Sequence, residues 1–91
     1  MIGTIKHKGL AELRRTGKTG RIGADRIRKY IRILQLLDAA NRPEDMNIAG
    51  LHFQALAGQA KAWSVRVTGN YRITFGWSGE TAIDVDLEDY H

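Results

Sequence analysis

Three consecutive segments in the second half of the chain have apolar residues that alternate with polar ones. The segments are AWSVRV, YRITFGW and TAIDVDL, and only TGN and SGE separate them. A period of two is typical of strands with one buried face, and such short connections join antiparallel neighbours. The sequence therefore predicts a three-stranded antiparallel meander, with a further short strand near LHFQAL. Its apolar face is expected to hold Trp63, Val65, Val67, Tyr71, Ile73, Phe75, Trp77, Thr81, Ile83, Val85 and Leu87.

The register of the first two of these strands brings two positive charges together. If their apolar faces coincide, residues 68–70 form a three-residue loop and Arg66 lies opposite Arg72. Like charges directly across a strand pair are unfavourable. We therefore expect this face either to receive carboxylates from Asp84 and Asp86 on the third strand or to bind an anion.

The first half of the chain has a helical period. MIGTI is compatible with a short strand, and HKGLAELRRTG then predicts a short helix that Gly17 closes. A longer helix is expected to have Asp25 as its N-cap and to end near Asn41, before Pro43. Its apolar face is predicted to contain Ile27, Ile31, Leu34 and Leu37.

These elements predict a single α+β domain over residues 1–91. A short N-terminal strand and two N-terminal helices would precede a twisted antiparallel sheet of about four strands, with the helices packed on one side. The chain has no cysteine, which excludes a disulfide framework, a thiolate zinc site and a thiol nucleophile. No apolar run approaches the ~20 residues that span a bilayer. We therefore expect a cytoplasmic protein without a membrane partner.

Positive charge is concentrated in the first part of the sequence. Residues 1–35 contain ten Lys or Arg and two acidic residues, whereas residues 36–91 contain four basic and eight acidic residues. The overall net charge is +4. A basic half on a small domain favours a polyanionic partner, of which nucleic acid is the first candidate. Ordinary solvated helix faces are the alternative.

Several familiar chemical sites are not supported by the motifs. GKTG contains part of a phosphate loop, but the full pattern needs a glycine where Glu12 stands and a strand before the loop. Asp84, Asp86 and Glu88 lie along a strand, which spreads them too far apart for one calcium or magnesium ion. The histidines have no short metal-ligand spacing, and the serines lack a nucleophile elbow. We expect no metal and no cofactor.

The residues near the end of the sequence offer proton-transfer chemistry. Asp89, Tyr90 and His91 follow the last predicted strand, and Arg72 lies on its neighbour. Metal-free RNA cleavage needs a group to accept the 2′-hydroxyl proton, a group to protonate the leaving 5′-oxygen, and a cation for the phosphoryl charge. These four side chains include all three types. A solvated terminal segment is the alternative.

The frame MIGTIKHKGLAELRRTG, followed by WSVRVTGNYRITF and a final EDYH, resembles the HigB toxins of the RelE/ParE superfamily, also called plasmid maintenance system killer proteins. The resemblance implies a RelE-like, microbial-ribonuclease-type fold. It also implies an mRNA endoribonuclease that cleaves A-site codons on translating ribosomes without a metal and so inhibits translation. Its expected partners are the 70S ribosome, mRNA and a HigA-like helix-turn-helix antitoxin, through which alone it would meet operator DNA.

The resemblance also carries roles onto particular positions. Its catalytic residues fall on Arg72, Asp89, Tyr90 and His91. The family's LHPLKG aligns with FQALAG, so its histidine falls on Gln54 and its lysine on Ala57. His52 lies two residues upstream and could replace the histidine only after a local shift. The residues expected to meet RNA or the ribosome are Lys6, Lys8, Arg14, Arg15, Lys18, Arg21, Arg66 and His52.

Two other functions fit parts of the sequence. A ParE-like toxin that binds a protein target would explain the missing histidine and lysine of LHPLKG, but the final DYH and the two sheet arginines argue against it. A plain nucleic-acid-binding module would use only the basic half and would bind RNA in a salt-dependent manner without toxicity.

Overall fold

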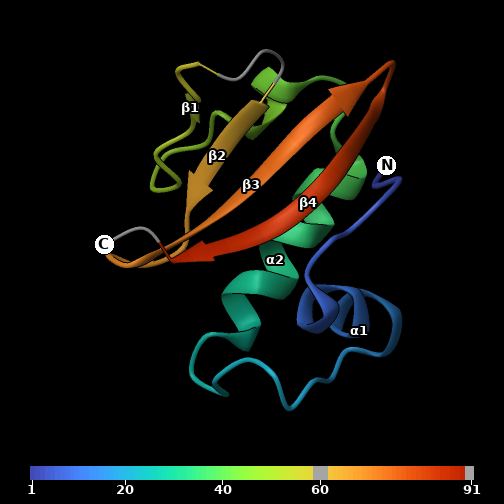
Figure 1. The fold of residues 1–91 in the computed structure, drawn as a ribbon, viewed down its shortest axis with the longest axis vertical. Helices are drawn as coiled ribbons and strands as arrows, with labels where there is room; N and C mark the ends of the chain where they lie inside the picture. The colour runs from blue at the N-terminus through green and yellow to red at the C-terminus, as the bar shows by residue number, and fades with distance from the viewer. Residues whose placement is uncertain (59–61, 90–91) are drawn as a thin grey trace.

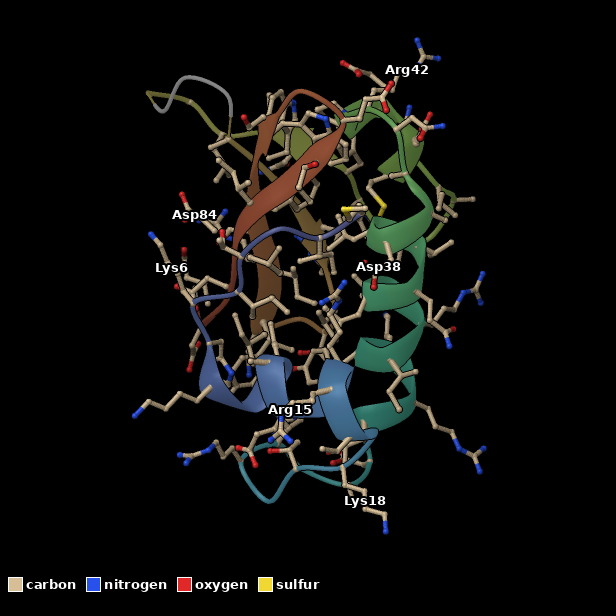
Figure 2. The ribbon with its side chains drawn as sticks, turned by 90° about the vertical axis from the view of Figure 1, so that its right-hand side faces the viewer. Lys6, Arg15, Lys18, Asp38, Arg42 and Asp84 are labelled. Carbon is tan, nitrogen blue, oxygen red and sulfur yellow. The ribbon has the colours of Figure 1, made fainter. Side chains whose placement is uncertain are left out.

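The computed structural model describes residues 1–58 and 62–89, in which two α-helices lie on one side of an antiparallel sheet (Figures 1 and 2). The strand order is β1-β2-β3-β4, and each strand pairs antiparallel with the next. This arrangement confirms the predicted α+β fold, the meander and the short strand before it. The elements are α1 (Lys8–Thr16), α2 (Ile27–Ala39), the 3-10 helix η1 (Pro43–Met46), β1 (Gln54–Ala55), β2 (Ala62–Arg66), β3 (Tyr71–Ser78) and β4 (Thr81–Asp89).

The N-terminal segment runs along β4 but does not form the predicted strand. It pairs with β4 at two isolated points, where Ile2 meets Ala82 and Ile5 meets Val85 in parallel orientation. Backbone hydrogen bonds between the segment and β4 include Gly3 N to Ala82 O and Lys6 N to Val85 O, both 2.7 Å. The segment therefore covers an edge of the sheet that would otherwise present unpaired backbone groups.

The ends of the two helices follow different rules. The Nδ1 atom of His7 accepts a hydrogen bond from Leu10 N at the start of α1, and Gly17 closes this helix in the left-handed conformation (φ 78°), as predicted. The prediction of Asp25 as the N-cap of α2 was wrong, because Arg26 occupies that position. A hydrogen bond from Arg26 N to Gly23 O closes a turn before the helix. The Arg26 guanidinium also lies over the Tyr71 ring, 4.7 Å from its centroid.

The buried face of α2 is rotated from the predicted one. Leu34 and Leu37 are buried as expected, but the other fully buried positions are Tyr30 and Ile33, while Ile27 and Ile31 are only partly buried. The aliphatic spacing omitted Tyr30, whose ring is one of the largest apolar surfaces in the core. Burial raises the pKa of its hydroxyl.

The apolar face of the sheet packs against this helix. The buried apolar residues of the three long strands are Val65, Ile73, Phe75, Ala82 and Val85. The partly buried rings of Trp63 and Trp77 flank Phe75, with centroids 6.4 and 6.2 Å from it. The core therefore lies between β2–β4 and α2.

A β-bulge in β4 changes which side chains face this core. The pairing of β3 with β4 shifts between Thr74 and Gly76, and Asp84 adopts a left-handed conformation (φ 52°). The Thr4 hydroxyl accepts a hydrogen bond from Asp84 N at 2.7 Å. The prediction that Ile83 faces inward was therefore wrong, because Ile83 pairs with Gly76 on the opposite face. Thr81 shares that face by alternation, so its predicted inward position was also wrong.

The conformation of Asp84 leads to a stability prediction. Asp84→Val should lower the free energy of unfolding by about 1–2 kcal/mol, because a β-branched residue is strained at this φ. Asp84→Gly should be at least as stable as the wild type. Denaturant unfolding measures both, with Asp86→Val as a control on the regular part of the strand. Equal stability of the two valine variants would show that the bulge imposes no such requirement.

Asp38 connects the N-terminal segment and both helices. Its carboxylate accepts hydrogen bonds from Ile2 N at 2.9 Å and from Arg14 Nε and Nη2 at 2.9 and 2.7 Å. Figure 2 shows Asp38 on α2. The Arg14 guanidinium lowers the pKa of Asp38, and the carboxylate raises the pKa of Arg14. One carboxylate therefore ties three segments together.

Asp38→Asn should lower the free energy of unfolding by about 1 kcal/mol at neutral pH, since it removes a charge-assisted bidentate pair that is partly exposed to solvent. The folded pKa of Asp38 lies below its unfolded value, so its contribution is complete above the ordinary carboxyl range, about pH 4. That contribution is lost as the pH falls through the folded value. Unfolding curves at several pH values should show the variant and wild type converging in acid. Glu80→Gln, an exposed control, should show no comparable difference.

Candidate functional site

The face of the sheet turned away from the helices carries polar side chains in register across the strands. Because side chains alternate along a strand, this face holds the residues between the buried positions. One row contains Gln54, Ser64, Thr74 and Asp86, and the next row contains Arg66, Arg72 and Glu88. The predicted pairing of Arg66 with Arg72 is therefore confirmed. We call this surface the open face.

A small pocket of about 30 Å³ lies on the open face between the first three strands. It is lined by His52, Gln54, Ser64, Arg66 and Arg72. His52 has a left-handed backbone (φ 50°) two residues before β1 begins at Gln54, so the chain turns at this residue. Both candidates for the family's histidine position, His52 and Gln54, therefore reach the pocket that contains the two arginines.

Arg72 is held in place by a carboxylate on the neighbouring strand. Its Nη2 atom donates to Glu88 Oε1 at 2.7 Å, and 22% of the Arg72 side chain is exposed. The predicted carboxylates were Asp84 and Asp86, but the bulge moves Asp84 out of register and Asp86 pairs with Thr74. Glu88 lies directly opposite Arg72. The Arg72 guanidinium is therefore partly buried, and its ion pair with Glu88 fixes its orientation.

Of the predicted catalytic residues, the structure places Arg72 and Asp89. Asp89 is the last residue of β4 and pairs with Tyr71. Because side chains alternate along a strand, the Asp89 side chain lies on the face of the sheet opposite to that of Arg72. The two residues are nevertheless close along the sheet, since Asp89 directly follows Glu88, the partner of Arg72 on the neighbouring strand. Tyr90 and His91 lie outside the described residues.

Two of the predicted RNA-binding cations are engaged in ion pairs within the protein. Arg14 binds Asp38, as described above, and Arg21 Nε lies 2.6 Å from Glu12 Oε1. Both pairs are partly exposed to solvent, so each contributes about 1 kcal/mol or less to stability. Their positive charge is nevertheless partly neutralised.

The remaining predicted cations are dispersed over the molecule. Lys6 lies on the sheet side near Asp84, whereas Arg15 and Lys18 project from the end that carries α1 and the following loop (Figure 2). Lys8 is exposed at the start of α1. Only Arg66 and His52 of the predicted RNA-binding set line the pocket with Arg72. The basic half of the sequence therefore does not form one patch beside the pocket.

A larger groove of about 440 Å³ extends along the open face and was not predicted from the sequence. Its lining includes Gly76, Ile83, Asp84, Asp86 and Glu88. Gly76 lies between Phe75 and Trp77 in β3, has no side chain and lines this groove. A glycine at an outward position of a strand was the signal that could have revealed this groove. No group of three potential metal ligands comes together within residues 1–58 and 62–89.

Comparison with known proteins assigns the family. Residues 3–91 match the HigB-like toxins, described as RelE-like toxins of the type II toxin-antitoxin system HigB. The chain belongs to the HigB-like toxin family. It is 34% identical over 92 residues to "Endoribonuclease HigB" of Proteus vulgaris, and the match covers the whole of both chains. It is also 38% identical over 61 residues to "Toxin HigB-1" of Vibrio cholerae, which covers 65% of this chain and 64% of that protein.

Membership in the HigB-like family confirms the resemblance noted in the sequence and implies an antitoxin partner. The two-layer fold agrees with it. Among the described residues, neither helix has the length and apolar composition needed to cross a membrane.

The pocket of this HigB-like toxin leads to a prediction about RNA binding. Arg72→Gln should weaken binding of a 2′-deoxy-substituted, uncleavable oligonucleotide, because it removes one cation from the open face. The slope of log K against log salt should become shallower by about 0.7, the value for one phosphate contact on a single strand. Fluorescence anisotropy at several salt concentrations measures this slope. Arg42→Gln, which removes an exposed cation that does not line the pocket, is the matched control, and identical slopes in both variants would place RNA elsewhere.

Proposed function

We propose that this HigB-like toxin is an endoribonuclease that inhibits translation by cutting mRNA in the ribosomal A site without a metal. The observation that carries the proposal is the match, over the full length of both chains, to a protein named Endoribonuclease HigB. The pocket supports it independently, because two arginines lie side by side on an open face that carries no helix. Phosphoryl transfer needs such positioned cations for the charge that develops on the phosphate oxygens.

The proposed reaction is a transphosphorylation within the RNA. The 2′-oxygen forms a bond to the adjacent phosphorus while the bond to the 5′-oxygen breaks, leaving a 2′,3′-cyclic phosphate and a 5′-hydroxyl. One group removes the 2′-hydroxyl proton and another protonates the departing oxygen. We assign these two roles to Asp89 and His91, and the phosphoryl charge to Arg72. Tyr90 orients the RNA or stacks on a base.

Gln54 limits which residues can transfer protons. It stands at the position of the histidine in the LHPLKG motif of the HigB toxins. Its side-chain amide can donate a hydrogen bond to a phosphate but cannot act as a proton donor or acceptor in catalysis near neutral pH. His52 lines the same pocket and is the nearest described imidazole to the arginines. We therefore place acid–base chemistry on Asp89 and His91, with His52 in RNA binding.

The proposed partners follow from this activity. Cleavage in the A site requires the 70S ribosome, and hence a cytoplasmic location. We further propose that the antitoxin is a HigA-like helix-turn-helix protein encoded beside the toxin, and that the toxin meets operator DNA only through it. A helix-turn-helix reading frame next to the toxin gene would support this part of the proposal.

The activity is tested by mapping new 5′ ends on mRNA bound to translating ribosomes. The wild type should produce ends within A-site codons, and His91→Ala should reduce the cleavage rate by about 10²–10⁴-fold, the usual contribution of a general acid or base. His7→Ala is the matched control, because His7 caps α1 and does not line the pocket.

Two results would contradict the proposal. If the wild type gives no new ends on ribosome-bound mRNA, the reaction is wrong. If growth arrest on expression persists undiminished in His91→Ala, toxicity comes from a ParE-like interaction with a protein target.

A further inference from the structure

A second basic feature lies on α2, apart from the open face. Helix α2 and the segment before His52 enclose a groove of about 400 Å³. Its lining includes Arg28, Lys29, Arg32, Ile33, Ile48 and Leu51. None of its lining residues belongs to the pocket or to the large groove of the open face. We call it the α2 groove.

The rim of the α2 groove is cationic and its floor is aliphatic. Arg28, Lys29 and Arg32 are exposed, and no ion pair of these side chains occurs among residues 1–58 and 62–89. The accessible apolar surface of the floor comes from the partly buried Ile48 and the exposed Ala49, with Leu51 8% exposed and Ile33 fully buried beneath them. Among the described residues, the lining includes no carboxylate. The groove therefore presents apolar surface beneath a rim that carries three positive charges.

These cations are placed where the helix itself does not favour them. Arg28 and Lys29 lie in the first turn of α2, which has no acidic residue. The N-terminal end of a helix carries a partial positive charge, so cations there are unfavourable. Arg28 and Arg32 are also like charges at i and i+4, a further unfavourable pair. Local rules that are broken together on one surface are typical of a binding site.

The lining also distinguishes between two kinds of acidic partner. A nucleic acid would bring bases that stack on aromatic rings, and none of the residues in the described part of the chain that line the α2 groove is aromatic. A branched aliphatic side chain, by contrast, fits a floor of isoleucine and leucine. Flanking carboxylates would meet the arginines and the lysine at the rim. The complementary ligand is a peptide segment in which acidic residues surround an aliphatic one.

We propose that the α2 groove is the docking site for an acidic segment of the antitoxin that carries a branched aliphatic anchor residue. The proposal relies on the antitoxin partner that family membership implies, and not on RNA cleavage. The anchor side chain enters between α2 and residues 48–51, and its neighbouring carboxylates bind the rim. The contact buries Ile48, which is partly exposed in the free toxin.

Suitable variants must leave the neighbouring pocket intact. Leu51 O accepts a hydrogen bond from Arg66 N at 2.6 Å, so large changes to the groove floor would disturb the pocket. Arg32→Glu reverses one rim charge, and Ala49→Trp fills the groove from an exposed position without changing charge. Arg42→Glu reverses one exposed charge outside the groove and serves as the matched control.

The experiment measures binding of the purified protein encoded beside the toxin gene, by titration calorimetry with the full-length toxin. Arg32→Glu and Ala49→Trp should each weaken binding by about tenfold or more, whereas Arg42→Glu should stay within about twofold of the wild type. Circular dichroism and thermal unfolding establish that each variant is folded. The same variants are assayed for mRNA cleavage on ribosomes.

Three outcomes would overturn the docking site. Wild-type affinity in both groove variants shows that the antitoxin binds elsewhere. A loss in Arg32→Glu alone indicates long-range attraction without insertion into the groove. Weakened RNA cleavage with unchanged antitoxin affinity would assign the groove to nucleic acid. A wild-type toxin that fails to cleave RNA contradicts the proposed function but leaves the binding comparison valid.

Discussion

Burial of one face of the sheet under α2 is the constraint on which the rest of the structure depends. Tyr30 and Ile33 of the helix belong to one buried cluster with Phe75 and other residues of the sheet, and these three side chains are almost completely removed from water. Both α-helices of the described part of the chain lie on this side of the sheet (Figure 1). The opposite face is therefore left open, and its polar residues are available for binding.

The N-terminal segment shapes the open face although it contributes little to it. Thr4 accepts a hydrogen bond from the Asp84 backbone and so supports the bulge, while Asp38 holds the same segment against α2. The bulge reverses the alternation within β4, which places Ile83 on the open face and brings Glu88 opposite Arg72. The contacts of the N-terminal segment with α2 and β4 thus determine that Glu88 is the carboxylate that pairs with Arg72, a candidate catalytic residue.

The meander and the Arg66–Arg72 pairing could be predicted because they depend on local alternation and loop length. The face of α2 was predicted incorrectly, since aliphatic spacing alone gives no weight to Tyr30. The bulge was missed because it depends on a hydrogen bond between Thr4 and Asp84, which are far apart in the sequence. The same is true of the Arg14 pair with Asp38, which lie on different helices. Long-range polar contacts leave no periodic signal.

Charge varies along the open face in a way that bears on the proposed reaction. The pocket end holds Arg66 and Arg72, whereas the groove end holds Asp84 and Asp86. A phosphate is attracted to the first and repelled by the second, so the phosphate that reacts should lie at the arginine end. Asp89 ends β4 at that same end, directly across from Tyr71 and one residue after Arg72's partner Glu88. The carboxylates of the groove therefore oppose RNA binding along the whole face and favour a single position for the scissile phosphate.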